Sequence, residues 1–114
     1  MNLAEYLRAT LVGVALTLPP IPSSAENITG NELLRWLDDP RGFTQLGGLA
    51  YVSGAKDGME ISGEVCLPNG VSNGQVTKIV HKYLKENPAE LHLPAVGIIY
   101  VSLGGTFPCD KKKR

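Results

Sequence analysis

Residues 66–109 read CLPNGVSNGQVTKIVHKYLKENPAELHLPAVGIIYVSLGGTFPC and are bounded by the only two cysteines of the 114-residue chain. The stretch opens with a Cys-Leu-Pro-Asn-Gly turn and closes with Phe-Pro-Cys. A bridge between Cys66 and Cys109 would close a loop of about 44 residues, which the loop-entropy model values at about 4 kcal/mol, comparable with the whole stability of a small domain. We therefore expect one disulfide, with two free thiols as the alternative in a reducing compartment.

The first 25 residues indicate an oxidising compartment. Arg8 precedes an uncharged apolar run at residues 9–18, prolines at 19, 20 and 22 then interrupt any helix, and Ser23-Ser24-Ala25 supplies small residues at a cleavage point. This layout is typical of a secretory signal peptide, and the run is shorter than the about 20 residues that span a bilayer. We predict a signal peptide over residues 1–25 and a periplasmic mature chain without membrane contact; a packed N-terminal helix is the alternative.

The clearest helix signal in the chain lies between residues 72 and 88. Ser72 and Gln75 have the spacing of a capping box, in which each side chain bonds the other residue's main-chain N–H. Apolar side chains then recur at three-and-four spacing, with lysines on the opposite face, until Asn87-Pro88. The apolar stripe comprises Val76, Ile79, Val80, Tyr83 and Leu84. This pattern predicts an amphipathic helix whose basic face is either solvated or a partner contact.

The last segment, residues 94–107, is ambiguous by itself. Its Val, Ile and Tyr residues favour a strand, and Gly97, Gly104 and Gly105 oppose a helix. However, Pro94 suits the first turn of a helix, and a lone strand would lack a pairing partner. We predict a helix.

Upstream, two further helices are expected. Thr29 and Glu32 form a second capping box, followed by leucines at helical spacing up to Pro40. Trp36 lies beside that stripe and is expected to pack on the core. Residues 44–61 are helix-compatible, with one predicted inward face. That face comprises Leu46, Leu49, Ala50, Ser53, Gly54 and Asp57, and Asp57 on it is expected to be a buried, hydrogen-bonded structural carboxylate.

Together these patterns predict an all-α fold, a small bundle of four to five helices with one disulfide, over residues 26–110. Residues 111–114 (KKKR) form a basic C-terminal tail, expected to be solvated, that brings the formal net charge to zero. No basic patch interleaved with aromatic residues is present, so nucleic-acid binding is not expected.

Catalytic and cofactor sites are not expected. The chain has two histidines, and no motif places His81 or His92 beside a nucleophile. His92 precedes Leu93-Pro94 and is interpreted as a turn residue. Two cysteines 43 positions apart lack the paired spacing of a zinc site, and Gly47-Gly48 lacks the spacing and the lysine of a phosphate loop. We predict a binding protein without catalytic residues, metal or cofactor.

The chain resembles the Rap/Tai family of type VI secretion amidase-effector immunity proteins. The resemblance covers nearly all of the mature chain and is most specific in its second half. The matching elements are Thr29-Gly30-Asn31-Glu32-Leu33-Leu34, Tyr51-Val52-Ser53-Gly54 with Asp57, Cys66-Leu67-Pro68, Gly70-Val71, Gln75, Tyr83-Leu84, Asn87-Pro88, Leu93-Pro94-Ala95 and Phe107-Pro108-Cys109. Leu37 and Gly48 stand near the places where many relatives have a second cysteine pair.

This resemblance implies an exported, all-helical inhibitor with a disulfide from the turn before the third helix to the C-terminal end. Family members bind and block a peptidoglycan amidase effector injected into the periplasm, and some act as homodimers. The resemblance therefore implies an amidase effector as partner, with a homodimer as a further expectation. A periplasmic stress or chaperone-like small helical protein is the alternative function.

An inhibitor needs complementary surface rather than a reactive group, and exposed loops held by rigid helices are the physical candidates. Residues 56–68 are expected to form such a loop, anchored at Cys66. The predicted effector-binding residues are Lys56, Glu60 and Glu64 in this loop, with Lys78 and Lys82 on the basic face of the helix that follows.

Overall fold

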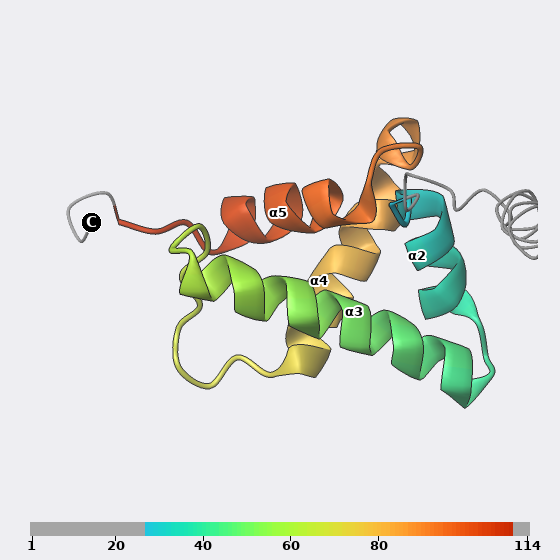
Figure 1. Cartoon of the computed structure of the whole chain (residues 1–114), viewed down its shortest axis with the longest axis horizontal. Helices are drawn as coiled ribbons and strands as arrows, with labels where there is room; N and C mark the ends of the chain where they lie inside the picture. Colours follow the sequence, from blue (N-terminus) through green and yellow to red (C-terminus); the bar gives the residue numbers. More distant parts are fainter. Residues whose placement is uncertain (1–26, 111–114) are drawn as a thin grey trace, which may run out of the picture.

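A computed structural model describes residues 27–110 of the chain. The predicted signal peptide (1–25) and basic tail (111–114) lie outside the described residues. The described chain contains four α-helices and one short 3-10 helix, and no β-strand is formed within it, so the all-α prediction is confirmed (Figure 1). The elements are α2 (Gly30–Asp38), α3 (Gly42–Ile61), α4 (Asn73–Glu86), η1 (Pro88–Glu90) and α5 (Ala95–Thr106).

Both predicted capping boxes are present. At α2, Thr29 Oγ1 accepts from the main-chain N–H of Glu32 at 3.3 Å, and Glu32 Oε2 accepts from that of Thr29 at 2.9 Å. At α4, Ser72 and Gln75 make the same exchange at 3.1 and 2.9 Å. These bonds satisfy N–H groups that have no partner inside the first turn of a helix.

The last segment is a helix, as predicted, and main-chain bonds explain where it begins. The N–H groups of Gly30 and Asn31 donate to the carbonyls of Leu93 and Leu91 at 2.9 and 2.8 Å. The N–H of Ala95, the first residue of α5, donates to the carbonyl of Ile28 at 2.7 Å. The extended backbone before α2 and before α5 is thus paired, and α5 begins where this pairing ends.

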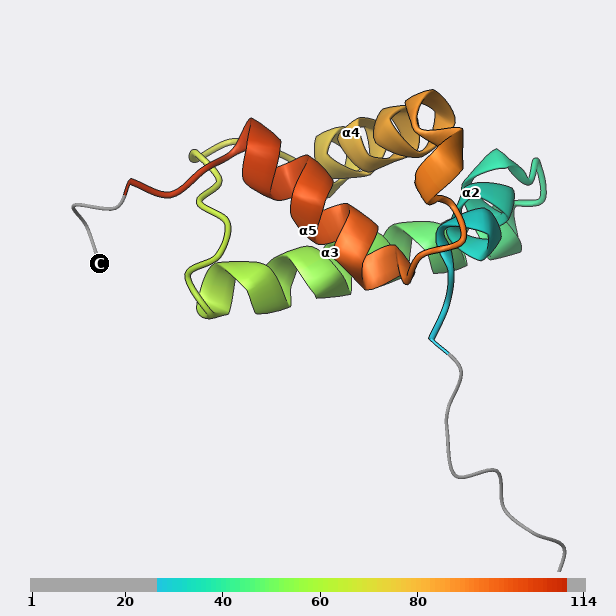
Figure 2. The same cartoon turned by 90° about the horizontal axis from the view of Figure 1, so that it is seen from above.

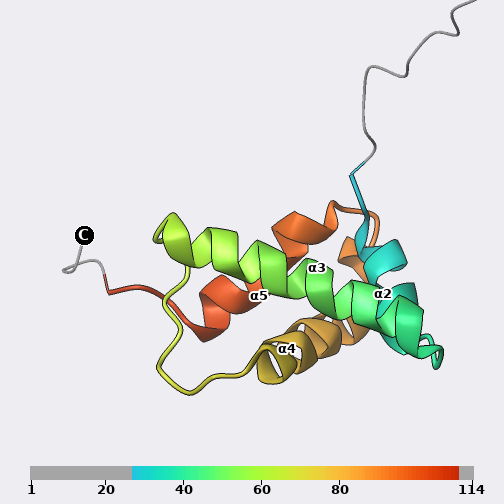
Figure 3. The same cartoon turned by 60° about the horizontal axis from the view of Figure 1, so that its bottom comes forward.

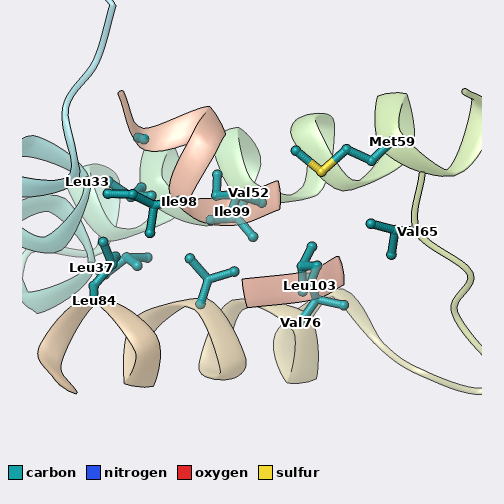
Figure 4. Close-up of a cluster of buried hydrophobic side chains, with 12 residues drawn as sticks. Leu33, Leu37, Val52, Met59, Val65, Val76, Leu84, Ile98, Ile99 and Leu103 are labelled. Carbon is teal, nitrogen blue, oxygen red and sulfur yellow. The ribbon is translucent and has the colours of Figure 1, made fainter. Parts of the chain in front are cut away.

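The core lies between α3, α4 and α5, with α2 closing one end (Figure 4). The larger fully buried side chains include Leu33 of α2, Val52 of α3, Leu84 of α4, and Ile99 and Leu103 of α5. Burial of an aliphatic side chain of this size stabilises the fold by about 1.5–3 kcal/mol. Trp36 is half-buried at the edge of this core and packs edge-to-face on Tyr51, with ring centroids 6.4 Å apart.

The prediction of which residues of α3 face the core is wrong. Leu46 is 60% exposed, and Ala50, Gly54 and Asp57 are also exposed. The buried residues of α3 are instead Gly48, Val52 and Met59. Small and apolar residues surround this helix, so a second stripe (48, 52, 55, 59) fits helical spacing equally well, and the core selects that one. Asp57 is therefore a surface carboxylate and not a buried structural one.

The disulfide joins Cys66 to Cys109, with their Cα atoms 4.9 Å apart, which excludes two free thiols. It ties the chain after α3 to the chain after α5. Figure 2 shows α5 lying across α3 and α4, and Figure 3 shows α3 in front with α4 alongside. Within residues 27–110, no helix has both the length and the apolar character needed to cross a membrane.

Candidate partner-binding surface

No cluster of three or more His, Cys, Asp or Glu side chains capable of holding a metal occurs in residues 27–110. Every buried side-chain nitrogen and oxygen in the same residues has a hydrogen-bond partner. His92 lies exposed in the turn before α5, as predicted. Of the predicted contact residues, Glu60, Glu64, Lys78 and Lys82 are exposed and Lys56 is partly buried.

The stretch predicted as a loop from Lys56 to Pro68 begins later than expected. Helix α3 continues to Ile61, so Lys56 and Glu60 lie on its last two turns. The Lys56 ammonium is 2.8 Å from the Asp57 carboxylate and 3.5 Å from that of Glu60, one helical turn on. The bond to Asp57, with the charges of both carboxylates, raises the pKa of Lys56. The glycine content suggested a loop, but the burial of Met59 holds this part of the chain helical.

The loop proper spans residues 62–72 and is fixed firmly at its base. The main-chain N–H groups of Glu64 and Val65 donate to the carbonyl of Met59 at 2.9 and 3.4 Å, and the Val65 side chain is buried. Cys66 is held twice, by the disulfide and by its N–H bond to the carbonyl of Phe107 at 3.0 Å. The tip, residues 68–70, is exposed. Glu64 is thus an exposed carboxylate on rigid backbone.

The five predicted contact residues line different hollows of the described surface or none. Lys78 lines a hollow of about 400 Å³ between α3 and α4, together with Leu46 and Leu49. Lys82 lines a different hollow between α4 and α5, and its ammonium lies 3.9 Å from Glu86. Neither hollow includes Lys56, Glu60 or Glu64. The five residues stay the predicted contacts, and they share none of the described hollows as a set.

Exposed apolar side chains were missed by sequence reasoning. Phe43 and Ile61, at the two ends of α3, are 91% and 89% exposed. On α5, Val96, Tyr100 and Val101 are each about half exposed. The signal for α5 was available: a helix of twelve residues with no charge must show apolar surface on any side that its own chain leaves uncovered.

Comparison with known proteins identifies the class. The family model described as Rap1a immunity proteins matches residues 29–109, from the cap of α2 to the second cysteine. The chain belongs to this family of immunity proteins. A search of curated proteins found no match. Membership of an immunity family implies a protein that acts by binding a partner effector, in a family that is generally non-enzymatic.

Proposed function

We propose that this chain is a periplasmic immunity protein that binds and blocks a type VI secretion peptidoglycan amidase effector. The observation that carries the proposal is the family match, which extends over both capping boxes and both cysteines. The disulfide supports a periplasmic location, because such bonds persist in oxidising compartments. The signal-peptide pattern of residues 1–25 supports the same location.

The proposed mode of action is steric. The end of α3 and the base of the 62–72 loop present Glu60 and Glu64 on backbone that the disulfide and Val65 hold in place. The Lys56 side chain is only 12% exposed and is paired with Asp57 and Glu60, so it supports this surface more than it extends it. A rigid surface loses little conformational entropy on binding, which favours a tight complex. Lys78 and Lys82 on α4 are the further proposed contacts with the effector.

Co-expression tests the function directly. The full chain is produced with each of a panel of type VI amidase effectors directed to the periplasm, and lysis is scored. We expect rescue from one or a few amidases, and no rescue by a matched chain that lacks residues 1–25 and stays in the cytoplasm. Rescue from none of the amidases would contradict the proposal, and equal rescue by the cytoplasmic chain would contradict the periplasmic location.

Stoichiometry separates this function from a chaperone-like one, which the exposed Phe43 and Ile61 would also suit. A specific inhibitor forms one complex of fixed ratio with its amidase, whereas a chaperone binds many unfolded clients. A homodimer, which the family resemblance implies, stays a prediction; sedimentation of the free chain over a range of concentrations tests it.

A further inference from the structure

Helix α5 is apolar on two opposite faces. One face is buried in the core and carries Ala95, Ile98, Ile99, Ser102 and Leu103. The opposite face, here named the α5 outer face, consists of Val96, Gly97, Tyr100, Val101 and Gly104. In the view of Figure 2, α5 lies in front of α3 and α4, and no element of residues 27–110 covers its near side. An uncharged helix normally has both faces covered, so this one suits a partner.

Two shallow hollows flank the Tyr100 side chain on this face. The first has about 290 Å³ and is lined by Met59, Glu64 and Gly97 among others. The second has about 300 Å³ and includes Glu64, Gly104 and Cys109. A Cβ atom built on Gly97 or Gly104 meets nothing within 4 Å. These glycines are therefore not required by packing within the described chain, and they leave space that another molecule can enter.

The charge on this surface decides between two kinds of occupant. Glu64 borders both hollows, and no described hydrogen bond or ion pair engages its carboxylate. No lysine or arginine is among the described residues that line either hollow. A second copy packed through Tyr100 would bring two Glu64 carboxylates into one interface, which like-charge repulsion and desolvation disfavour. A different protein with a basic side chain beside apolar ones has the complementary charge.

We propose that the α5 outer face, with Glu64, is a docking surface for the effector, and that it receives an apolar segment flanked by a lysine or arginine. This inference rests on the proposed function and adds a surface that the sequence did not indicate. Glu64 connects the base of the 62–72 loop with the α5 outer face, because it follows the end of α3 and also borders the hollows of α5. The effector footprint would extend from the loop base across Tyr100.

Filling the hollows tests the surface without disturbing the fold. The probe is the amidase that the full chain neutralises in co-expression, and its affinity is measured by calorimetry. Gly97→Gln and Gly104→Gln place a side chain in each hollow at a position open to solvent. Gly47→Gln is the matched control, because Gly47 is equally open but lies on α3 away from both hollows. We expect at least about tenfold weaker binding for the two α5 variants, as for changes at the centre of an interface, and no change for the control.

The basic partner residue has its own test. Glu64→Gln should weaken binding and reduce its dependence on salt, because one charge pair is lost. Asp39→Asn, between α2 and α3 and outside both hollows, should do neither. An unchanged salt dependence for Glu64→Gln would overturn the assignment of a basic contact.

The outcomes separate this inference from the proposed function. If the wild-type chain binds its amidase and the Gly97 and Gly104 variants bind equally well, the α5 outer face is not the docking surface. The proposed function is unaffected by that result. If sedimentation shows a dimer of the free chain that Gly97→Gln disperses, a second copy occupies the face and the inference is overturned. If no amidase is bound at all, the proposed function itself fails.

Discussion

At the scale of single residues, Gly30 shows why one glycine cannot be replaced. A Cβ atom at this buried first residue of α2 would lie 2.5 Å from Ile98 Cδ1 and 3.0 Å from the carbonyl oxygen of Leu91. The Ile98 side chain can move, but the Leu91 main chain is held by the pairing at the start of α2. We expect Gly30→Ala to lower the free energy of unfolding by about 1–3 kcal/mol, as overpacking does. Urea denaturation measures this effect.

Gly47→Ala provides the comparison for Gly30. Its added Cβ meets nothing within 4 Å, so the only effect is higher helix propensity in α3. The free energy of unfolding should rise by about 0.5–1 kcal/mol. If Gly30→Ala is as stable as the wild type, or is stabilised like Gly47→Ala, the close approach of α2 to α5 is not what requires glycine at position 30.

The hydrogen bond from Tyr83 to Glu90 is a single-residue contact that depends on pH. The Tyr83 hydroxyl donates to Glu90 Oε2 at 2.7 Å, and this bond to a carboxylate raises the pKa of Tyr83 above its ordinary value of 10.0. Because the folded pKa is the higher one, the contribution to stability is fully present below about pH 10 and is lost as the pH rises through the folded pKa. Tyr83→Phe should cost about 0.5–1.5 kcal/mol at neutral pH.

Denaturation at pH 7 and above pH 10 checks this contact. The wild-type chain should lose stability over that interval by more than the Tyr83→Phe variant does. Identical losses in the two chains would assign the alkaline transition to other groups, such as Tyr51, whose pKa burial raises.

At the scale of elements, local signals predicted the helices better than their orientation. Both capping boxes and the stripe of α4 were read correctly, because each depends on residues within one or two turns. The inward face of α3 was not predicted correctly, because apolar side chains surround that helix and only packing with α2, α4 and α5 chooses among them. The α5 outer face was missed for a related reason: a helix apolar on both sides gives no amphipathic signal.

The predicted contact residues stay a prediction, and the structure shows where each of them lies. Lys56, Glu60 and Glu64 follow each other closely in sequence, and the structure keeps them at one end of α3 and its loop. Lys78 and Lys82 share one helix and an apparent basic face, yet they line different hollows. Spacing along α4 could not show this, because the positions of α3 and α5 determine which hollow each lysine borders.

The cap of α4 carries a prediction for the element as a whole. Ser72→Ala removes the side-chain acceptor for the Gln75 N–H and should cost about 1 kcal/mol. Thr77→Ala in the same helix removes only a bond from a hydroxyl to the carbonyl of Asn73, one turn back. That bond adds nothing to helix stability, so this control should be neutral or slightly stabilising. A Ser72→Ala chain with unchanged unfolding would mean that packing alone sets the start of α4.

At the scale of the whole molecule, a short chain gains its stability from several modest sources. The core draws its larger side chains from all four α-helices, so no helix keeps a buried face without the others. Both ends of the described chain are joined to distant segments: the residues before α2 pair with those before α5, and Cys109 is bonded to Cys66. The same disulfide holds the base of the loop next to Glu64, so fold stability and the proposed binding surface depend on one bond.

Removing that disulfide is the strongest test at this scale. Its cysteines are 43 positions apart, and the loop-entropy model gives the bond about 4 kcal/mol of stability. Small domains have about 5–15 kcal/mol of stability, so such a loss would remove a large fraction of it. We therefore expect a Cys66→Ser/Cys109→Ser chain to unfold at a markedly lower urea concentration than the oxidised wild type, and to match the wild type treated with a thiol reductant. The reductant should leave the double variant unchanged. If the reduced and oxidised chains unfold at the same urea concentration, the bond serves only to position the loop, and amidase binding by the double variant would then measure that role alone.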